Sequence, residues 1–214
     1  MDIAVEPGKR NSRLVYAGID VSAPLSALWD ALSAYERLQT FIPGLKVSRC
    51  LNRRPGGARL LQEATQDIAL GLRFRARCIL DVDEWPRGIS QELCWSNTIG
   101  DIDEFENQFT MKDTEMIKFP EPRSLLQTSA SDISFDLVEG DFFAFRGMWR
   151  MQSIPPKAEA TFNANANAVH LTRLSYSLYV RPKQWLPVGL IESRIGREVM
   201  TNLSSVASYV EAAQ

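Results

Sequence analysis

Few residues in this chain of 214 belong to the types that carry nucleophilic or metal-dependent chemistry. His170 is the single histidine, and the three cysteines, Cys50, Cys78 and Cys94, are widely spaced without a Cys-x-x-Cys pair. One histidine argues against multi-histidine metal sites, and no serine or cysteine stands at a motif spacing that would make it a nucleophile partnered by His170. We therefore predict no catalytic residue, no metal site and no cofactor.

Two carboxylates flank a glycine at Glu139-Gly140-Asp141. Such a pair can perform acid–base chemistry. A hairpin turn favours the same residue types, because glycine readily adopts a positive φ, and we favour the turn. An enzyme stays an alternative if Glu92, Glu139 or His170 proves to be buried in a pocket.

Two glutamines fall among the apolar positions of one predicted strand. Gln62 and Gln66 share a face with Leu60, Ala64 and Ile68. A buried amide needs hydrogen-bond partners. Either these amides orient a carbonyl or hydroxyl group of a ligand, or a bulge turns them outward.

Aromatic side chains recur on the apolar faces of the predicted strands. A single inward-facing aromatic residue is typical of an ordinary core. The group of them together indicates a cavity wall that contacts a flat or isoprenoid molecule. The inward-facing set comprises Phe74, Phe135, Phe143, Phe145, Trp149 and Tyr176.

Charge excludes one class of function. The 24 basic and 26 acidic residues give a net charge of −2, so no global field favours nucleic acid. A basic row at Arg73, Arg75 and Arg77 is typical of a solvated strand face whose charges pair with neighbouring carboxylates.

The elements follow from hydrophobic periodicity. A strand over 13–21 precedes a helix that we expect Ser22 to cap, with Pro24 in its first turn. Residues 1–12 are polar and predicted to be loose. Further strands are expected at 45–52, 58–70, 72–83, 89–96, 131–138, 142–153 and 171–180.

A long amphipathic helix is predicted to end the chain near Ala212. Its apolar stripe recurs at steps of three and four residues: Val188, Ile191, Ile195, Val199, Leu203, Val206 and Val210. We expect Ile191, Ile195 and Val199 to face a cavity, and Arg194, Arg197 and Glu198 to face solvent. Trp185, just before the helix, either gates the cavity, dips into a bilayer surface or fixes the start of the helix.

The pattern indicates a single domain over 13–212. It is interrupted by an acidic insertion at 97–130 and by an Ala/Asn-rich loop at 155–169, which we expect to be flexible. No stretch approaches the ~18 apolar residues of a membrane span. The three unpaired cysteines suit a reducing compartment. We expect a cytoplasmic protein, or a stromal one if a plastid transit peptide has been removed.

Three segments resemble a known group: 28–45 (LWDALSAYERLQTFIPGL), 135–149 (FDLVEGDFFAFRGMW) and 178–187 (LYVRPKQWLP), the last followed by the helix. Together they are similar to the polyketide cyclase/dehydrase and coenzyme Q-binding branch of the START-like superfamily, and to its uncharacterised cyanobacterial and plastid members. The resemblance implies an α+β helix-grip fold, in which a curved antiparallel sheet of about six to seven strands wraps around a long C-terminal helix.

The resemblance implies binding or transport of a hydrophobic small molecule, such as a lipid, a quinone or another isoprenoid. The expected lining combines the residues above: Gln62, Phe74, Phe135, Phe143, Phe145, Trp149, Tyr176, Trp185, Ile191, Ile195 and Val199. Transient contact with a membrane surface is an additional expectation. Two alternatives stay open, a cyclase or aromatase and a module that recruits a protein partner through the acidic 97–130 segment.

Overall fold

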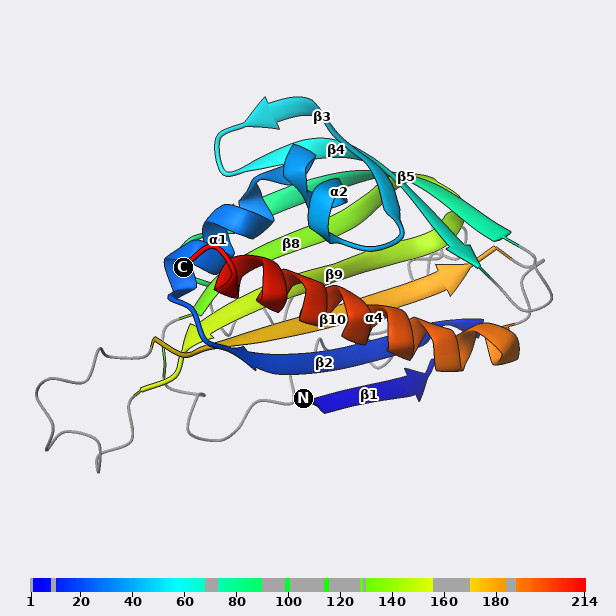
Figure 1. Ribbon diagram of the computed structural model, residues 1–214. Helices are drawn as coiled ribbons and strands as arrows, with labels where there is room; N and C mark the ends of the chain where they lie inside the picture. Colours follow the sequence, from blue (N-terminus) through cyan, green and yellow to red (C-terminus); the bar gives the residue numbers. More distant parts are fainter. Residues whose placement is uncertain are drawn as a thin grey trace, which may run out of the picture.

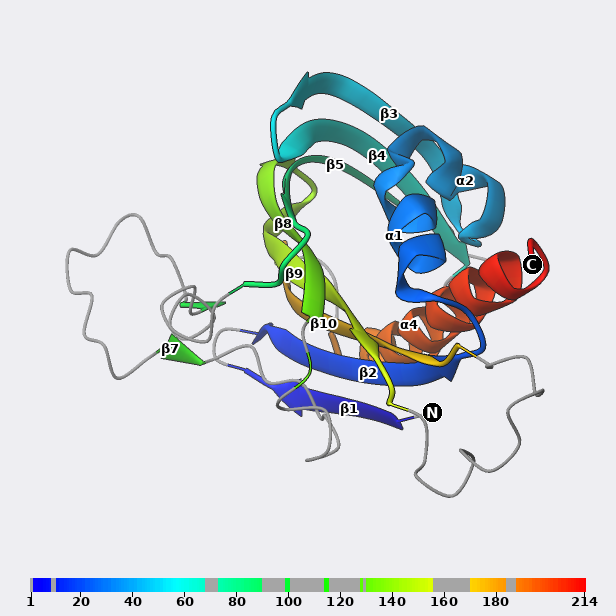
Figure 2. The ribbon, with the colours of Figure 1, turned by 90° about the vertical axis from the view of Figure 1, so that its left-hand side faces the viewer.

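An eight-stranded antiparallel sheet forms the body of the molecule in the computed structural model (Figure 1). The structure describes residues 2–8, 11–67, 73–89, 99–100, 114–115, 128, 130–155, 170–183 and 188–214. The strong twist of the sheet makes one face concave, and the helices α1 (Leu25–Ser33), α2 (Leu38–Phe41) and α4 (Val188–Glu211) lie on that face (Figure 2). This arrangement is the predicted α+β helix-grip fold.

The elements run in the order β1 (Asp2–Pro7), β2 (Arg13–Val21), α1 (Leu25–Ser33), η2 (Tyr35–Arg37), α2 (Leu38–Phe41), β3 (Leu45–Arg54), β4 (Gly57–Asp67), β5 (Arg73–Trp85), β6 (Ile99–Gly100), β7 (Thr114–Glu115), β8 (Ala130–Gly140), β9 (Phe142–Ser153), β10 (Thr172–Pro182) and α4 (Val188–Glu211). In the main sheet the strands lie in the order β1-β2-β10-β9-β8-β5-β4-β3, and β6 pairs with β7 alone. The sheet thus has one strand more than the upper end of the predicted count.

The added strand is β1, so the prediction that residues 1–12 are loose is wrong for Asp2–Pro7. β1 pairs with β2 in antiparallel register. The Arg173 side chain of β10, 4% exposed, donates to Asp20 at 3.0 Å and to Asp2 at 2.6 Å, which ties three strands together. Only Ile3 and Val5 alternate in this short edge strand, too few positions for a periodicity signal.

The first helix begins later than predicted. α1 starts at Leu25 with Pro24 in the N-cap position and no side-chain cap, so the predicted cap by Ser22 is wrong. A residue before proline is confined to extended conformations, which keeps Ala23 out of the helix. The backbone N–H of Ser22 instead donates to Glu211 Oε1 of α4 at 2.8 Å.

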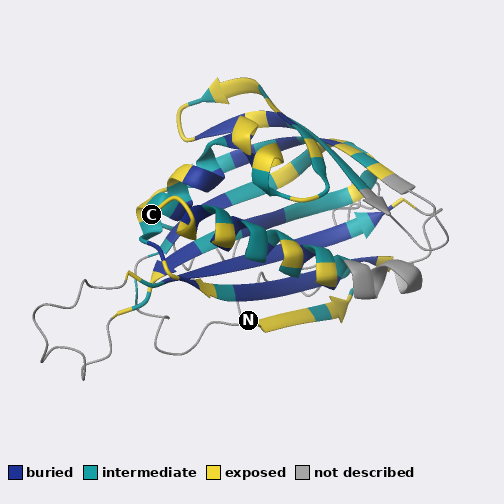
Figure 3. Cartoon of the chain, viewed as in Figure 1, coloured by how far each residue is buried: buried dark blue, intermediate teal, exposed yellow. Residues whose placement is uncertain are grey.

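Buried residues lie on the concave face of the sheet and on the sides of the helices that face it (Figure 3). From α4 the core receives Val199, Leu203, Val206 and Val210, which confirms the apolar stripe over this part of the helix. The sheet contributes alternate residues, as the period of two requires. In β10 these are Leu174, Tyr176, Leu178 and Val180.

The predicted hairpin around Glu139-Gly140-Asp141 is confirmed by the pairing of β8 with β9. Asp141 Oδ2 accepts a hydrogen bond from the backbone N–H of Arg77 at 2.7 Å, and Glu139 is exposed, so both carboxylates serve the turn. The predicted strand at 89–96, most of the 97–130 segment and most of the 155–169 loop lie outside the described residues.

Candidate functional site

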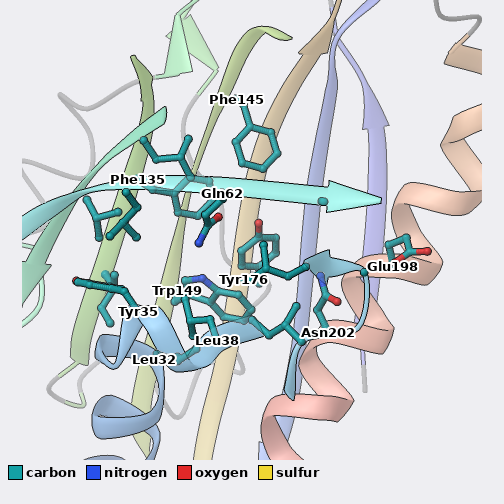
Figure 4. Close-up of a pocket in the computed structure, with 18 of the residues that line it drawn as sticks. Leu32, Tyr35, Leu38, Gln62, Phe135, Phe145, Trp149, Tyr176, Glu198 and Asn202 are labelled. Atoms are coloured by element: carbon teal, nitrogen blue, oxygen red, sulfur yellow. The ribbon is translucent and has the colours of Figure 1, made fainter. Parts of the chain in front are cut away.

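A cavity opens between the concave face of the sheet and the helices (Figure 4). The centre of a water molecule can occupy about 180 Å³ of it, many times the ~10–15 Å³ that one water needs. Most of its lining is apolar: Leu32, Tyr35, Leu38, Ile42, Pro43, Gly44, Leu45, Leu60, Gln62, Ala64, Leu80, Val82, Ile133, Phe135, Phe145, Trp149, Tyr176, Glu198 and Asn202.

One wall of the cavity is aromatic and comes from β8, β9 and β10. Trp149 and Tyr176 are direct cross-strand partners whose ring centroids lie 4.3 Å apart. The ring of Phe135 lies 6.1 Å from that of Tyr176 and 5.5 Å from that of Phe145. Phe135 faces Gly147 on β9, where the absent side chain leaves room for the ring. The structure thus brings four of the predicted aromatics together around the cavity.

The Tyr176 hydroxyl is a polar group of this aromatic wall. Among the described residues it has no hydrogen-bond partner. Burial alone raises the pKa of this phenol well above its usual range, so Tyr176 stays protonated at neutral pH. A protonated phenol can donate a hydrogen bond to an acceptor on a ligand.

Gln62 of β4 faces inward and lines the cavity, which favours the first of its two predicted orientations. Its Nε2 donates weakly to Ser48 Oγ at 3.4 Å. Ser48 Oγ in turn donates to the backbone carbonyl of Tyr35 at 2.6 Å, and the backbone N–H of Ser48 donates to Gln39 Oε1 at 2.9 Å. The amide is therefore connected to the segment that joins α1 to α2.

The helix α4 lines the cavity with other residues than the predicted Ile191, Ile195 and Val199. Glu198 and Asn202, four residues apart on one side of the helix, line the cavity, so Glu198, predicted to face solvent, is partly exposed and also borders the cavity. Ile195 packs half-buried at the edge of the core and Val199 is buried within it. The sheet covers the centre of the apolar stripe of α4. The polar residues beside the stripe, Glu198 and Asn202, therefore line the cavity.

Phe143 is a second correction. It is 52% exposed, and its ring lies beneath the Arg181 guanidinium at 5.1 Å. The pairing of β9 with β10 shifts register between Arg181 and Pro182, where Pro182 faces Phe142. A bulge of this kind reverses the alternation, so Phe142 packs against the core and stacks on Phe145 at 5.2 Å.

Three predicted lining residues cannot be placed. Trp185 and the side chains of Phe74 and Ile191 lie outside the part of the chain that the structure describes. In the other direction, sequence reasoning missed Tyr35, Leu38 and the turn 42–45. These residues follow α1, in a segment of the sequence that has no regular hydrophobic periodicity. Without periodicity, the sequence does not indicate which side chains face inward.

The candidate catalytic groups do not gather in the cavity. His170 and Glu139 are exposed, and Glu92 lies outside the described residues. Over the described ranges, no cluster of three or more His, Cys, Asp or Glu side chains is arranged to hold a metal ion. Within the same ranges, no helix combines the length and the apolar character needed to cross a membrane.

The sequence matches one protein family over most of its length. The family described as polyketide cyclase / dehydrase and lipid transport matches residues 21–207, which span β2 to α4. The chain belongs to this family. No curated protein matches the sequence significantly.

Solved structures share the fold across nearly the whole chain. A STAR-related lipid transfer protein from Xanthomonas axonopodis has a TM-score of 0.59 at 9% identity and covers 97% of this chain and 98% of its own. A START superfamily protein from Mycobacterium smegmatis (0.54, 15% identity) covers 94% of this chain and 99% of its own. The Zhui aromatase/cyclase from Streptomyces sp. R1128 (0.55, 12% identity) covers 94% of each. At these identities the likeness establishes the fold.

Proposed function

We propose that this protein binds a hydrophobic small molecule, such as a lipid, a quinone or another isoprenoid, in the cavity between sheet and helices. The observation that carries the proposal is the cavity itself, a largely apolar void of about 180 Å³. Protein interiors normally pack to crystal-like density and leave few voids larger than a water molecule. A largely apolar cavity of this size is therefore a candidate site for an apolar ligand.

The energy available from burial suits an apolar ligand. Each buried CH₂ group contributes about 0.8 kcal/mol. A ligand that buries about ten such groups gains about 8 kcal/mol, which lies within the range of the association cost of about 4–15 kcal/mol. The aromatic wall adds edge and face contacts for rings or double bonds.

The way in lies between the α2–β3 connection and α4. Several lining residues on the two sides of this gap are partly or fully exposed: Ile42, Pro43 and Leu45 on one side, and Glu198 and Asn202 on the other. Tyr209 of α4 clamps α2 nearby, since its ring stacks on Phe41 at 4.1 Å. We propose that separation of α2 from α4 admits the ligand.

Native mass spectrometry of the purified protein, followed by organic extraction, tests the function. We expect a stoichiometric apolar adduct, or uptake of one from a panel of lipids and quinones. Ala64→Trp fills the cavity from β4 and should abolish the adduct, whereas Leu51→Trp, at a 47% exposed position on the edge strand β3, should keep it. A wild-type protein that stays free of every panel member would refute the proposal.

A second candidate is an enzyme of the cyclase or aromatase kind. It is supported by the presence of one carboxylate, Glu198, and one neutral phenol, Tyr176, in the same cavity. Such a pair can move protons on a chain held in a folded conformation. Incubation with a linear poly-β-keto thioester, with Glu198→Gln as the control, tests it: a cyclised product formed by the wild type alone would favour the enzyme.

A further inference from the structure

The polar groups of the cavity point to one kind of ligand atom. This inference rests on the proposed function and concerns the ligand's polar end. Among the hydrogen-bond donors of the lining, Tyr176 of β10 and Asn202 of α4 reach the cavity from the sheet and from the helix (Figure 4). The Tyr176 hydroxyl has no partner among the described residues.

Asn202 presents its amide nitrogen. Its Oδ1 atom is buried without a hydrogen-bond partner, so Nδ2 is the end of the side chain that meets the cavity (Figure 4). An amide N–H and a phenol O–H both seek an acceptor. Neither donor atom is among the buried atoms that lack a partner, so both are open to the cavity and can donate to a ligand acceptor.

The charge of the lining excludes an anionic acceptor. Glu198 stands one turn before Asn202 on α4 and lines the same cavity. Among the described lining residues there is no lysine, arginine or histidine to balance a second negative charge. A carboxylate or phosphate buried there would lack a counter-ion and would be repelled by Glu198.

We propose that the cavity recognises the oxygen of a neutral carbonyl group, as in a ketone, quinone or ester, through the Tyr176 hydroxyl and the Asn202 amide nitrogen. A carbonyl oxygen offers two lone pairs and brings no proton of its own, so it can accept from both donors. The apolar remainder of the ligand lies along Phe135, Phe145 and Trp149.

Three compounds with one naphthalene body test the proposal by equilibrium dialysis: 2-acetylnaphthalene, its alkene isostere 2-isopropenylnaphthalene, and 2-naphthoate. Two hydrogen bonds to one oxygen should make the wild type bind the ketone about tenfold more tightly than the alkene. The naphthoate should bind more weakly than the ketone.

Variants locate the source of the preference. Tyr176→Phe and Asn202→Leu should each reduce the ketone-to-alkene ratio to about threefold. Tyr35→Phe is the matched control, because Tyr35 also lines the cavity but its hydroxyl donates to Glu84 at 2.6 Å. This variant should keep the tenfold ratio. Because the readout is a ratio, a general loss of stability does not imitate the effect.

The outcomes separate the two proposals. Equal binding of ketone and alkene by the wild type, or an unchanged ratio in Tyr176→Phe, would overturn the carbonyl assignment while leaving hydrophobic binding intact. Tightest binding of 2-naphthoate would overturn it as well. If none of the three compounds binds, the proposed function fails for ligands of this size and the carbonyl assignment fails with it.

Discussion

Replacing Gly147 with alanine should destabilise the wall of the cavity. Gly147 lies on β9 between Phe145 and Trp149 and faces Leu178 on β10. An added Cβ would meet the backbone carbonyl oxygen of Ser177 well inside normal contact distance. It would also lie 2.7 Å from Phe135 Cζ and 3.2 Å from Leu178 Cα. Because two of the three atoms belong to the backbone, β9 and β10 must move apart and the Phe135 ring must swing into the cavity.

The magnitude follows from two costs. Overpacking of a well-packed interior costs about 1–3 kcal/mol. Displacing Phe135 from its contact with Tyr176 at 6.1 Å removes an aromatic pair, worth about 0.5–1.5 kcal/mol. Alanine recovers about 0.5–1 kcal/mol of backbone entropy relative to glycine. The expected net loss in the free energy of unfolding is about 2–3 kcal/mol.

Urea unfolding of Gly147→Ala beside Gly196→Ala is the assay. In Gly196→Ala the new Cβ on α4 would lie 3.3 Å from Ile3 Cδ1 and 3.5 Å from Val5 Cγ2, both ends of flexible side chains. This control should be neutral or gain up to about 1 kcal/mol from helix propensity. The reasoning is refuted if Gly147→Ala unfolds within about 0.5 kcal/mol of wild type, or if Gly196→Ala proves the more harmful change.

Three further predictions concern other parts of the fold. Burial raises the pKa of the Cys78 thiol from 9.0 to about 11, so the unfolded chain loses this proton first. This thiol should lower the free energy of unfolding by about 2 kcal/mol between pH 9 and 11, and the fall measured in unfolding titrations should be smaller by that amount in Cys78→Ala. Asp132 is fully buried and accepts hydrogen bonds from Arg150 at 2.9 and 3.0 Å, so Asp132→Asn should lower the free energy of unfolding by about 3–5 kcal/mol. Tyr209→Ala removes the stack on Phe41, so amide hydrogen exchange over 38–42 should quicken while the sheet stays protected.

Each of these has a comparison that isolates the cause. Asp81→Asn removes an equivalent pair with Arg59 at 2.7 Å, but both side chains are well exposed, so its loss should stay below about 1 kcal/mol; equal losses at Asp132 and Asp81 would contradict the role of burial. Tyr209→Phe keeps the stack and removes only the hydrogen bond from Arg37 at 2.6 Å. Exchange as fast in Tyr209→Phe as in Tyr209→Ala would show that the hydrogen bond, not the stack, holds α2.

Local patterns in the sequence were enough to predict the main elements. The alternation of Leu174, Tyr176, Leu178 and Val180 predicted the inward face of β10, because successive side chains of a strand must point to opposite sides. The stripe on α4 predicted its buried face by the same kind of argument at a period of 3.6. Family resemblance then linked these elements into the helix-grip fold, and Phe135, Phe145, Trp149, Tyr176 and Gln62 were all expected to face inward.

Only the tertiary structure determined which of the inward-facing residues line the cavity and which pack into the core. Periodicity separates the inside from the outside of an element, but it carries no information on whether a neighbour fills the space beyond. Val199 and Asn202 illustrate this, since the apolar residue packs into the core and the polar one lines the cavity. The bulge that exchanges Phe142 for Phe143 depends likewise on the register of β9 against β10. Register and curvature arise from contacts between distant segments, and so the cavity belongs to the fold and not to any one stretch of sequence.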